Sequence, residues 1–93
     1  MIHWSSFVTT DKPNIVVETI KRAEEGHGLI VRFYESQRRR GPATLTAGFD
    51  LAQVWRTNLL EENQVELALE GRSVSLFVEP YEIVTLRLVP VRQ

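Results

Sequence analysis

The chain has 93 residues, of which 43% are hydrophobic, and its 11 basic and 12 acidic side chains give a formal net charge of -1. This length predicts a single domain, residues 1–93, with one core. The balanced charge excludes the strongly basic surface of a nucleic-acid-binding protein, and the absence of cysteine excludes disulfides and thiolate metal sites. No segment resembles a membrane span or a signal peptide. These features favour a cytoplasmic location and leave the secretion of a longer parent chain open.

The first long element, residues 16–35, can be read as a helix followed by a strand or as a hairpin. Charge pairs spaced i,i+4, such as Glu18 with Arg22, favour a helix over its first half. An excess of β-branched residues in the same half, and the strongly β composition of the following LIVRFYE run, favour two strands. Gly26 and Gly28 lie between the two halves and suit a turn. We therefore favour the hairpin, with the helix as the alternative.

The rest of the chain consists of short runs in which apolar and polar residues alternate, each closed by turn residues. Glu70-Gly71 joins two of these runs as a tight hairpin, because glycine supplies the positive φ that such a turn needs. Pro90 marks the end or the edge of the last strand, since proline cannot donate a ladder hydrogen bond. The pattern predicts an all-β fold, an antiparallel β-sandwich of about seven to eight strands. The expected strands cover residues 4–8, 14–23, 29–35, 43–49, 53–58, 64–69, 72–78 and 83–89.

No constellation in the sequence predicts catalysis. His3 and His27 are the only histidines, and neither belongs to a metal-binding spacing. Adjacent acidic pairs such as Glu61-Glu62 point to opposite faces of a strand, so they cannot easily flank one glycosidic bond. The serines lack a nucleophile-elbow context. We expect no catalytic residue, no metal ligand and no cofactor in this chain.

Two groups of surface residues are candidates for binding. The three consecutive arginines before Gly41 can grip an acidic partner or a phosphate, although a solvated loop is the simpler interpretation. The large aromatics can form a sugar-stacking platform, although such residues more often anchor a core or a domain contact. The candidates for a domain interface or a sugar contact are Trp4, Tyr34, Arg38, Arg39, Arg40, Trp55 and Tyr81.

Both ends of the chain resemble the C-terminal β-domain of glycoside hydrolase family 38 α-mannosidases. The segment SSFVTTDKPNIVVETIKRAEEGHGLIVRFYE, residues 5–35, is similar to the family pattern SF, PN, a β-branched run, and then K-x-A-E-D-G-x-G-L-I-V-R-L-Y-E. The closing EPYEIVTLRL, residues 79–88, is similar to the family's final strand. Departures from the pattern are small: Glu25 and His27 stand where Asp is frequent, and Phe33 stands where Leu is frequent. None of them disturbs a hairpin.

The resemblance implies an antiparallel β-sandwich and turns residues 16–35 into two strands. It also implies that the catalytic machinery, a zinc ion held by Asp and His residues with an acidic nucleophile, belongs to an upstream domain absent from this chain. The expected role is that of a non-catalytic accessory domain, excised from a larger α-mannosidase that hydrolyses terminal α-mannosides with retention. Its expected partners are the upstream domains of the same polypeptide, with no nucleic acid and no membrane. The rival expectation is a carbohydrate-binding module that holds mannosides through surface aromatics.

Overall fold

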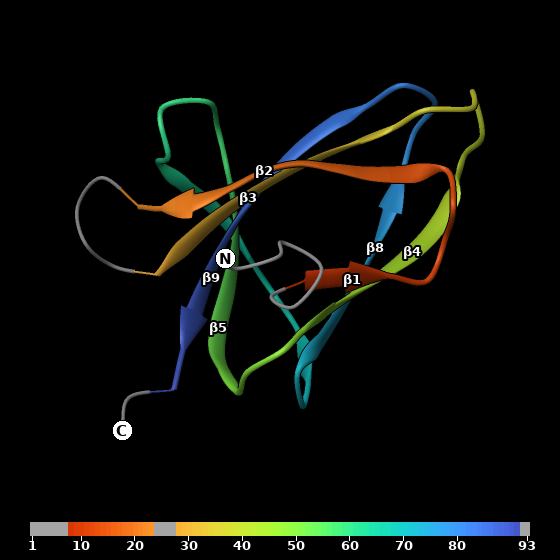
Figure 1. Ribbon diagram of the computed structural model, residues 1–93. Coiled ribbons are helices and arrows are strands. Elements are labelled where there is room, and N and C mark those ends of the chain that lie inside the picture. The colour runs from red at the N-terminus through yellow and green to blue at the C-terminus, as the bar shows by residue number, and fades with distance from the viewer. Residues whose placement is uncertain (1–7, 24–27, 92–93) are drawn as a thin grey trace, which may run out of the picture.

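The computed structural model describes residues 8–23 and 28–91, which form two antiparallel sheets (Figure 1). The four-stranded sheet has the order β1-β4-β8-β7, and the five-stranded sheet has the order β2-β3-β9-β5-β6. The strands are β1 (Val8–Thr10), β2 (Ile15–Arg22), β3 (Leu29–Glu35), β4 (Gly41–Ala47), β5 (Leu51–Thr57), β6 (Asn63–Leu67), β7 (Leu69–Glu70), β8 (Ser73–Val78) and β9 (Ile83–Pro90). Within these described residues, no helix is long and apolar enough to cross a membrane.

The core lies between the two sheets and is built from the inward positions of the alternating strands. Phe33 and Leu86 come from the five-stranded sheet, and Leu45 and Val74 come from the four-stranded one; all four are at most 3% exposed. Because successive side chains of a strand point to opposite faces, each strand contributes every second residue to this core. The predicted all-β antiparallel sandwich is therefore confirmed.

The hairpin prediction for residues 16–35 is also confirmed. β2 and β3 pair antiparallel from Ile15 opposite Glu35 to Arg22 opposite Leu29, with a register shift between Val17 and Thr19. Gly26 lies outside the described residues, but Gly28 has a φ of +84°. A Cβ on Gly28 would lie 2.4 Å from the carbonyl oxygen of Leu88 on β9. This position therefore needs glycine both for its backbone conformation and for the close approach of the neighbouring strand.

The structure differs from the sequence-based strand map in several places, including β5, which begins at Leu51 and not at residue 53. The run predicted as one strand over 64–69 is interrupted at Ala68, where the chain leaves the five-stranded sheet and enters the four-stranded one. This division gives nine strands in the described part of the chain. β4 begins two residues early, at Gly41, so that Pro42 lies inside a strand opposite Phe77. The strand predicted over 4–8 falls largely outside the described residues, and Val8 is the first residue of β1.

Candidate functional site

The outer face of the five-stranded sheet carries two of the predicted aromatic residues. Trp55 on β5 lies opposite Arg87 on β9, and Tyr34 on β3 lies opposite Ile83 on β9. Both rings are half-buried. Ile83 and Arg87 are four residues apart on one strand, which is about 13 Å along the sheet. Tyr34 and Trp55 therefore share a face without meeting as one platform.

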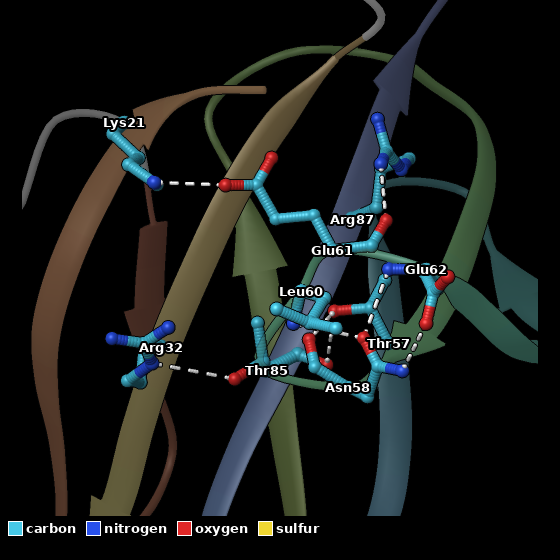
Figure 2. A network of polar contacts seen from close by, with 9 residues as sticks. All are labelled: Lys21, Arg32, Thr57, Asn58, Leu60, Glu61, Glu62, Thr85 and Arg87. Carbon is cyan, nitrogen blue, oxygen red and sulfur yellow. Dashed lines mark hydrogen bonds and ion pairs between the residues drawn. The ribbon is translucent and has the colours of Figure 1, made fainter. Parts of the chain in front are cut away.

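The connection between β5 and β6 folds back over this face (Figure 2). The Asn58 side-chain oxygen accepts hydrogen bonds from the backbone N–H groups of Leu60 (2.9 Å) and Glu62 (3.0 Å), which closes the loop on itself. Glu61 adopts a φ of 64° at the turn. Such side-chain-to-backbone bonds are the usual way in which asparagine fixes a tight connection.

Glu61 spans three strands of the sheet. Its backbone oxygen accepts a hydrogen bond from Arg87 Nη2, and its carboxylate pairs with Lys21 Nζ of β2 at 2.8 Å. Figure 2 shows the Glu61 side chain passing across β3 to reach Lys21. In the sheet register, Lys21, Ile30 and Arg87 form one row, so Glu61 lies over Ile30. Ile30 is completely buried and Arg87 is 7% exposed although both point away from the core. The connection between β5 and β6 thus shields Ile30 and Arg87 on this face from solvent.

A second polar centre, at one end of the sandwich, is formed by the buried carboxylate of Glu35, which is 1% exposed. Its Oε2 accepts hydrogen bonds from Asn14 Nδ2 (2.8 Å) and from the backbone N–H of Gln37 (2.9 Å). Its Oε1 accepts one from the backbone N–H of Tyr81 (3.0 Å). One side chain thus joins the start of β2, the connection after β3 and the turn before β9.

The hydrogen bonds around Glu35 decide its protonation. Burial acts to raise the pKa of the Glu35 carboxyl, because the charged form loses water. The N–H donors of Asn14, Tyr81, Gln37 and Arg39 outweigh burial and lower the pKa to about 2. A carboxyl that stays charged and is surrounded by donors within the same chain is a poor proton donor at neutral pH. Its arrangement is that of a structural anchor rather than a general acid.

The three arginines lie in the connection between β3 and β4, close to this anchor. Arg38 has a φ of 57°, and all three side chains are exposed. Arg39 and Arg40 line an open cleft of about 250 Å³, which Lys12 and Glu35 also line. Arg40 lies 3.8 Å from the Glu79 carboxylate, a weak and solvent-exposed ion pair. The structure therefore brings two of the three arginines to a cleft.

The remaining candidates lie apart from one another. Tyr81 is exposed, with a φ of 58°, in the turn between β8 and β9, where only its backbone reaches Glu35. Trp4 lies outside the described residues. The role of the seven candidates as interface or sugar contacts stays a prediction. Sequence reasoning did not select Glu35 or Asn14 as site residues, although both belong to the PN and YE motifs that carried the family resemblance.

The described residues do not fit a metal ion. Over residues 8–23 and 28–91, no group of three or more His, Asp or Glu side chains is arranged to hold one. The acidic groups with a shifted pKa are instead engaged by N–H donors and cations of the same chain. Arg56, for example, pairs with Glu82 at 2.6 Å and contributes to the lowered pKa of that carboxyl, against the opposing effect of burial. No zinc site is therefore assigned to residues 8–23 and 28–91.

The two antiparallel sheets and the internally bonded polar centres define a β-sandwich domain. Residues 14–86 match the family model described as the glycosyl hydrolases family 38 C-terminal beta sandwich domain. The chain belongs to this family of domains. The match starts at Asn14 and includes the β2–β3 hairpin, the Glu35 anchor and the first half of β9.

Relatives with assigned names are much longer proteins. The chain is 30% identical over 89 residues to alpha-mannosidase G of Dictyostelium discoideum, and the aligned region is 90% of this chain and 8% of the relative. It is 34% identical over 73 residues to a putative mannosylglycerate hydrolase of Halalkalibacterium halodurans, covering 78% of this chain and 8% of the relative. It is 30% identical over 91 residues to alpha-mannosidase 2C1 of Mus musculus, covering 92% of this chain and 9% of the relative. The chain thus spans less than a tenth of the length of these relatives.

Proposed function

We propose that this chain is a non-catalytic accessory domain of a larger α-mannosidase, where it packs on the rest of the enzyme and stabilises it. The observation that carries this proposal is the family match over residues 14–86, together with the small share of each relative that the chain represents. In those relatives the domain is one part of a chain about eleven to twelve times as long, by the 8% to 9% coverage. A domain of this kind contributes to the stability of the longer enzyme through its contacts with the other domains.

The chemistry of the buried groups supports the same proposal. The Glu35 carboxyl, with a pKa of about 2, is held by N–H donors from three segments and connects strands of the sandwich. Arg87, buried on the opposite face of the sheet from the core, is likewise bonded to Asn63 Oδ1 at 3.0 Å and to a backbone oxygen. These groups stabilise the domain itself.

The activity of the longer enzyme belongs to the same proposal. We assign to it the hydrolysis of terminal α-mannosides, with any zinc ion and the acidic nucleophile held by the preceding domains. The bacterial relative carries the name of a putative mannosylglycerate hydrolase. Membership of this domain family therefore does not determine which substrate the longer enzyme hydrolyses.

The test compares the longer polypeptide with and without residues 1–93. We expect its deletion to lower the melting temperature and the soluble yield of the remainder, and we expect the 93-residue chain alone to release no product from an aryl α-mannoside. Unchanged stability after deletion would contradict the stabilising role. Hydrolysis by the isolated chain would contradict the non-catalytic one.

The carbohydrate-binding alternative has its own experiment. Trp55 and Tyr34 have half-buried rings on one sheet face, so a bound mannoside would shift their side-chain NMR signals. Titration of the 93-residue chain with methyl α-mannoside to millimolar concentration distinguishes the two functions. Saturable shifts of the signals from these two rings would favour the carbohydrate-binding module. Signals that do not shift would favour the accessory role.

A further inference from the structure

The outward side of the four-stranded sheet is unlike the rest of the surface. Its outward positions on β1, β4 and β8 carry hydroxyls, one proline and one phenylalanine, although a quarter of the residues in the chain are charged. We call this surface the neutral face. It consists of Thr9, Pro42, Thr44, Thr46, Ser73, Ser75 and Phe77.

Four of the five hydroxyl groups of the neutral face pair with one another. Thr44 Oγ1 lies 2.9 Å from Ser75 Oγ, and Thr46 Oγ1 lies 2.9 Å from Ser73 Oγ, each across the β4–β8 pair. Burying a polar group is expensive mainly when it loses water without gaining a partner. Because these hydroxyls already have partners, a second surface can exclude water from them at a low cost.

The apolar end of the same face is exposed. Phe77 is 53% exposed and lies opposite Pro42, which is also exposed. Charged side chains occur at the two borders: Asp11 beyond β1 and Glu70 on β7. An uncharged centre with a charged rim is the arrangement of protein interfaces, whose cores are depleted of charged residues.

The outer side of the five-stranded sheet is the rival surface, and it differs in kind. The loop containing Glu61 covers the part of it around Ile30, and Lys21, Arg32 and Arg87 place cations there. The neutral face has no such cover among the described residues. Three strands spaced about 4.8 Å apart and six residues of about 3.4 Å rise give it dimensions of roughly 14 Å by 20 Å. That is about 280 Å², close to what each side of a small interdomain interface of about 600 Å² in total contributes.

We propose that the neutral face is the surface by which this domain docks on the preceding part of the same polypeptide. This inference rests on the proposed accessory function and specifies which side of the sandwich performs it. The occupant follows from the relatives, in each of which the matching region is at most 9% of a longer chain. The complementary surface is flat and uncharged at its centre, with an apolar group against Phe77.

The experiment measures the reaction of single introduced cysteines, which the absence of native cysteine in this chain makes unambiguous. Ser75→Cys reports on the neutral face. Ile83→Cys, at a residue 59% exposed on the outer side of the other sheet, is the matched control. Each is alkylated in the 93-residue chain and in the longer polypeptide, and the modified peptide is quantified by mass spectrometry. We expect the alkylation rate of Ser75→Cys to be at least about tenfold lower in the longer polypeptide than in the 93-residue chain, because thiol modification depends on solvent access. The rate of Ile83→Cys should be little changed.

The outcomes separate this inference from the proposed function. If deletion of the domain destabilises the longer polypeptide but Ser75→Cys reacts equally in both contexts, or if Ile83→Cys is protected instead, the accessory function stands and the docking face is wrong. If deletion has no effect and neither cysteine is protected, the proposed function fails. Protection of Ser75→Cys in the 93-residue chain that grows with its concentration, or on adding methyl α-mannoside, would replace the occupant by a second copy or by a sugar and overturn the inference.

Discussion

The Asn14 amide donates a 2.8 Å hydrogen bond to the Glu35 carboxylate, and this carboxylate is the group at which residues 5–35 meet the closing segment 79–88. Asn14 immediately precedes β2, Glu35 ends β3, and the second carboxylate oxygen receives the backbone N–H of Tyr81 from the closing EPYE segment. Residues separated by 21 and 46 positions are thereby fixed to one charged group. A buried charge is tolerated only when it is paired or hydrogen-bonded in this way.

Replacing this charge removes the acceptor on which three segments converge. In Glu35→Gln one carboxylate oxygen becomes an NH₂ group, which faces N–H donors instead of accepting from them. We expect a fall of about 5 °C or more in the melting temperature, measured by circular dichroism. Glu79→Gln is the control, because Glu79 is exposed and its ion pair with Arg40 is long, at 3.8 Å. Equal melting temperatures for the two variants would contradict the anchoring role.

Stability in acid depends on the same residue. The pKa of Glu35 is about 2 in the folded chain, below its ordinary value of 4.5, so its contribution to stability is complete above about pH 4.5. The contribution decreases as the pH falls from about 4.5 toward 2, because the unfolded state binds a proton more readily than the folded one. The lowered pKa values of Asp11 and Glu82 act in the same direction. Urea denaturation at a series of pH values measures this slope, and we expect it to be shallower for Glu35→Gln; identical slopes would contradict the lowered pKa.

Gly28 and Gly71 form a matched pair for testing the close approach of β9. Both have positive φ, but a Cβ at Gly28 meets the Leu88 carbonyl oxygen at 2.4 Å, whereas a Cβ at Gly71 meets nothing within 4 Å. We expect Gly71→Ala to lower the free energy of unfolding by about 1–2 kcal/mol, the cost of the left-handed backbone. Gly28→Ala adds a steric clash, for a total of about 3 kcal/mol or more. Equal losses in denaturant titrations would show that the clash relaxes freely.

The two cations that contact Glu61 are expected to differ strongly in their contribution to stability. Arg87 is 7% exposed and donates part-buried hydrogen bonds to Asn63 and to the Glu61 backbone, so Arg87→Ala removes a buried guanidinium together with both bonds. We expect a loss of about 2–3 kcal/mol in the free energy of unfolding. The Lys21 side chain is 44% exposed, and Lys21→Ala is expected to remove less than about 1 kcal/mol. A loss for Lys21→Ala as large as that for Arg87→Ala would mean that the ion pair, and not the buried arginine, holds the loop.

The alternation of apolar and polar residues was sufficient to predict the sandwich, because a strand buried on one face imposes a period of two. The hairpin around Gly28 was predicted from the β-branched composition, the turn glycines and the family resemblance. The alternation could not predict the change of sheet at Ala68, because Val65, Leu67 and Leu69 continue the same period across it. The environment of Glu35 was equally hidden. A glutamate at a strand end has the appearance of a solvated residue, and its donors come from segments that only the fold brings together.

The position of β9 has a consequence for how the domain is made. This strand lies in the middle of the five-stranded sheet, between β3 and β5, yet it is the last strand in the described part of the chain. While the ribosome is still synthesising residues 83–90, the β2–β3 hairpin and the β5–β6 hairpin have no common neighbour to join them. Their facing edges stay open to other chains until the eight residues of β9 arrive, so the nascent sheet is most exposed to mispairing in the interval before β9 is available.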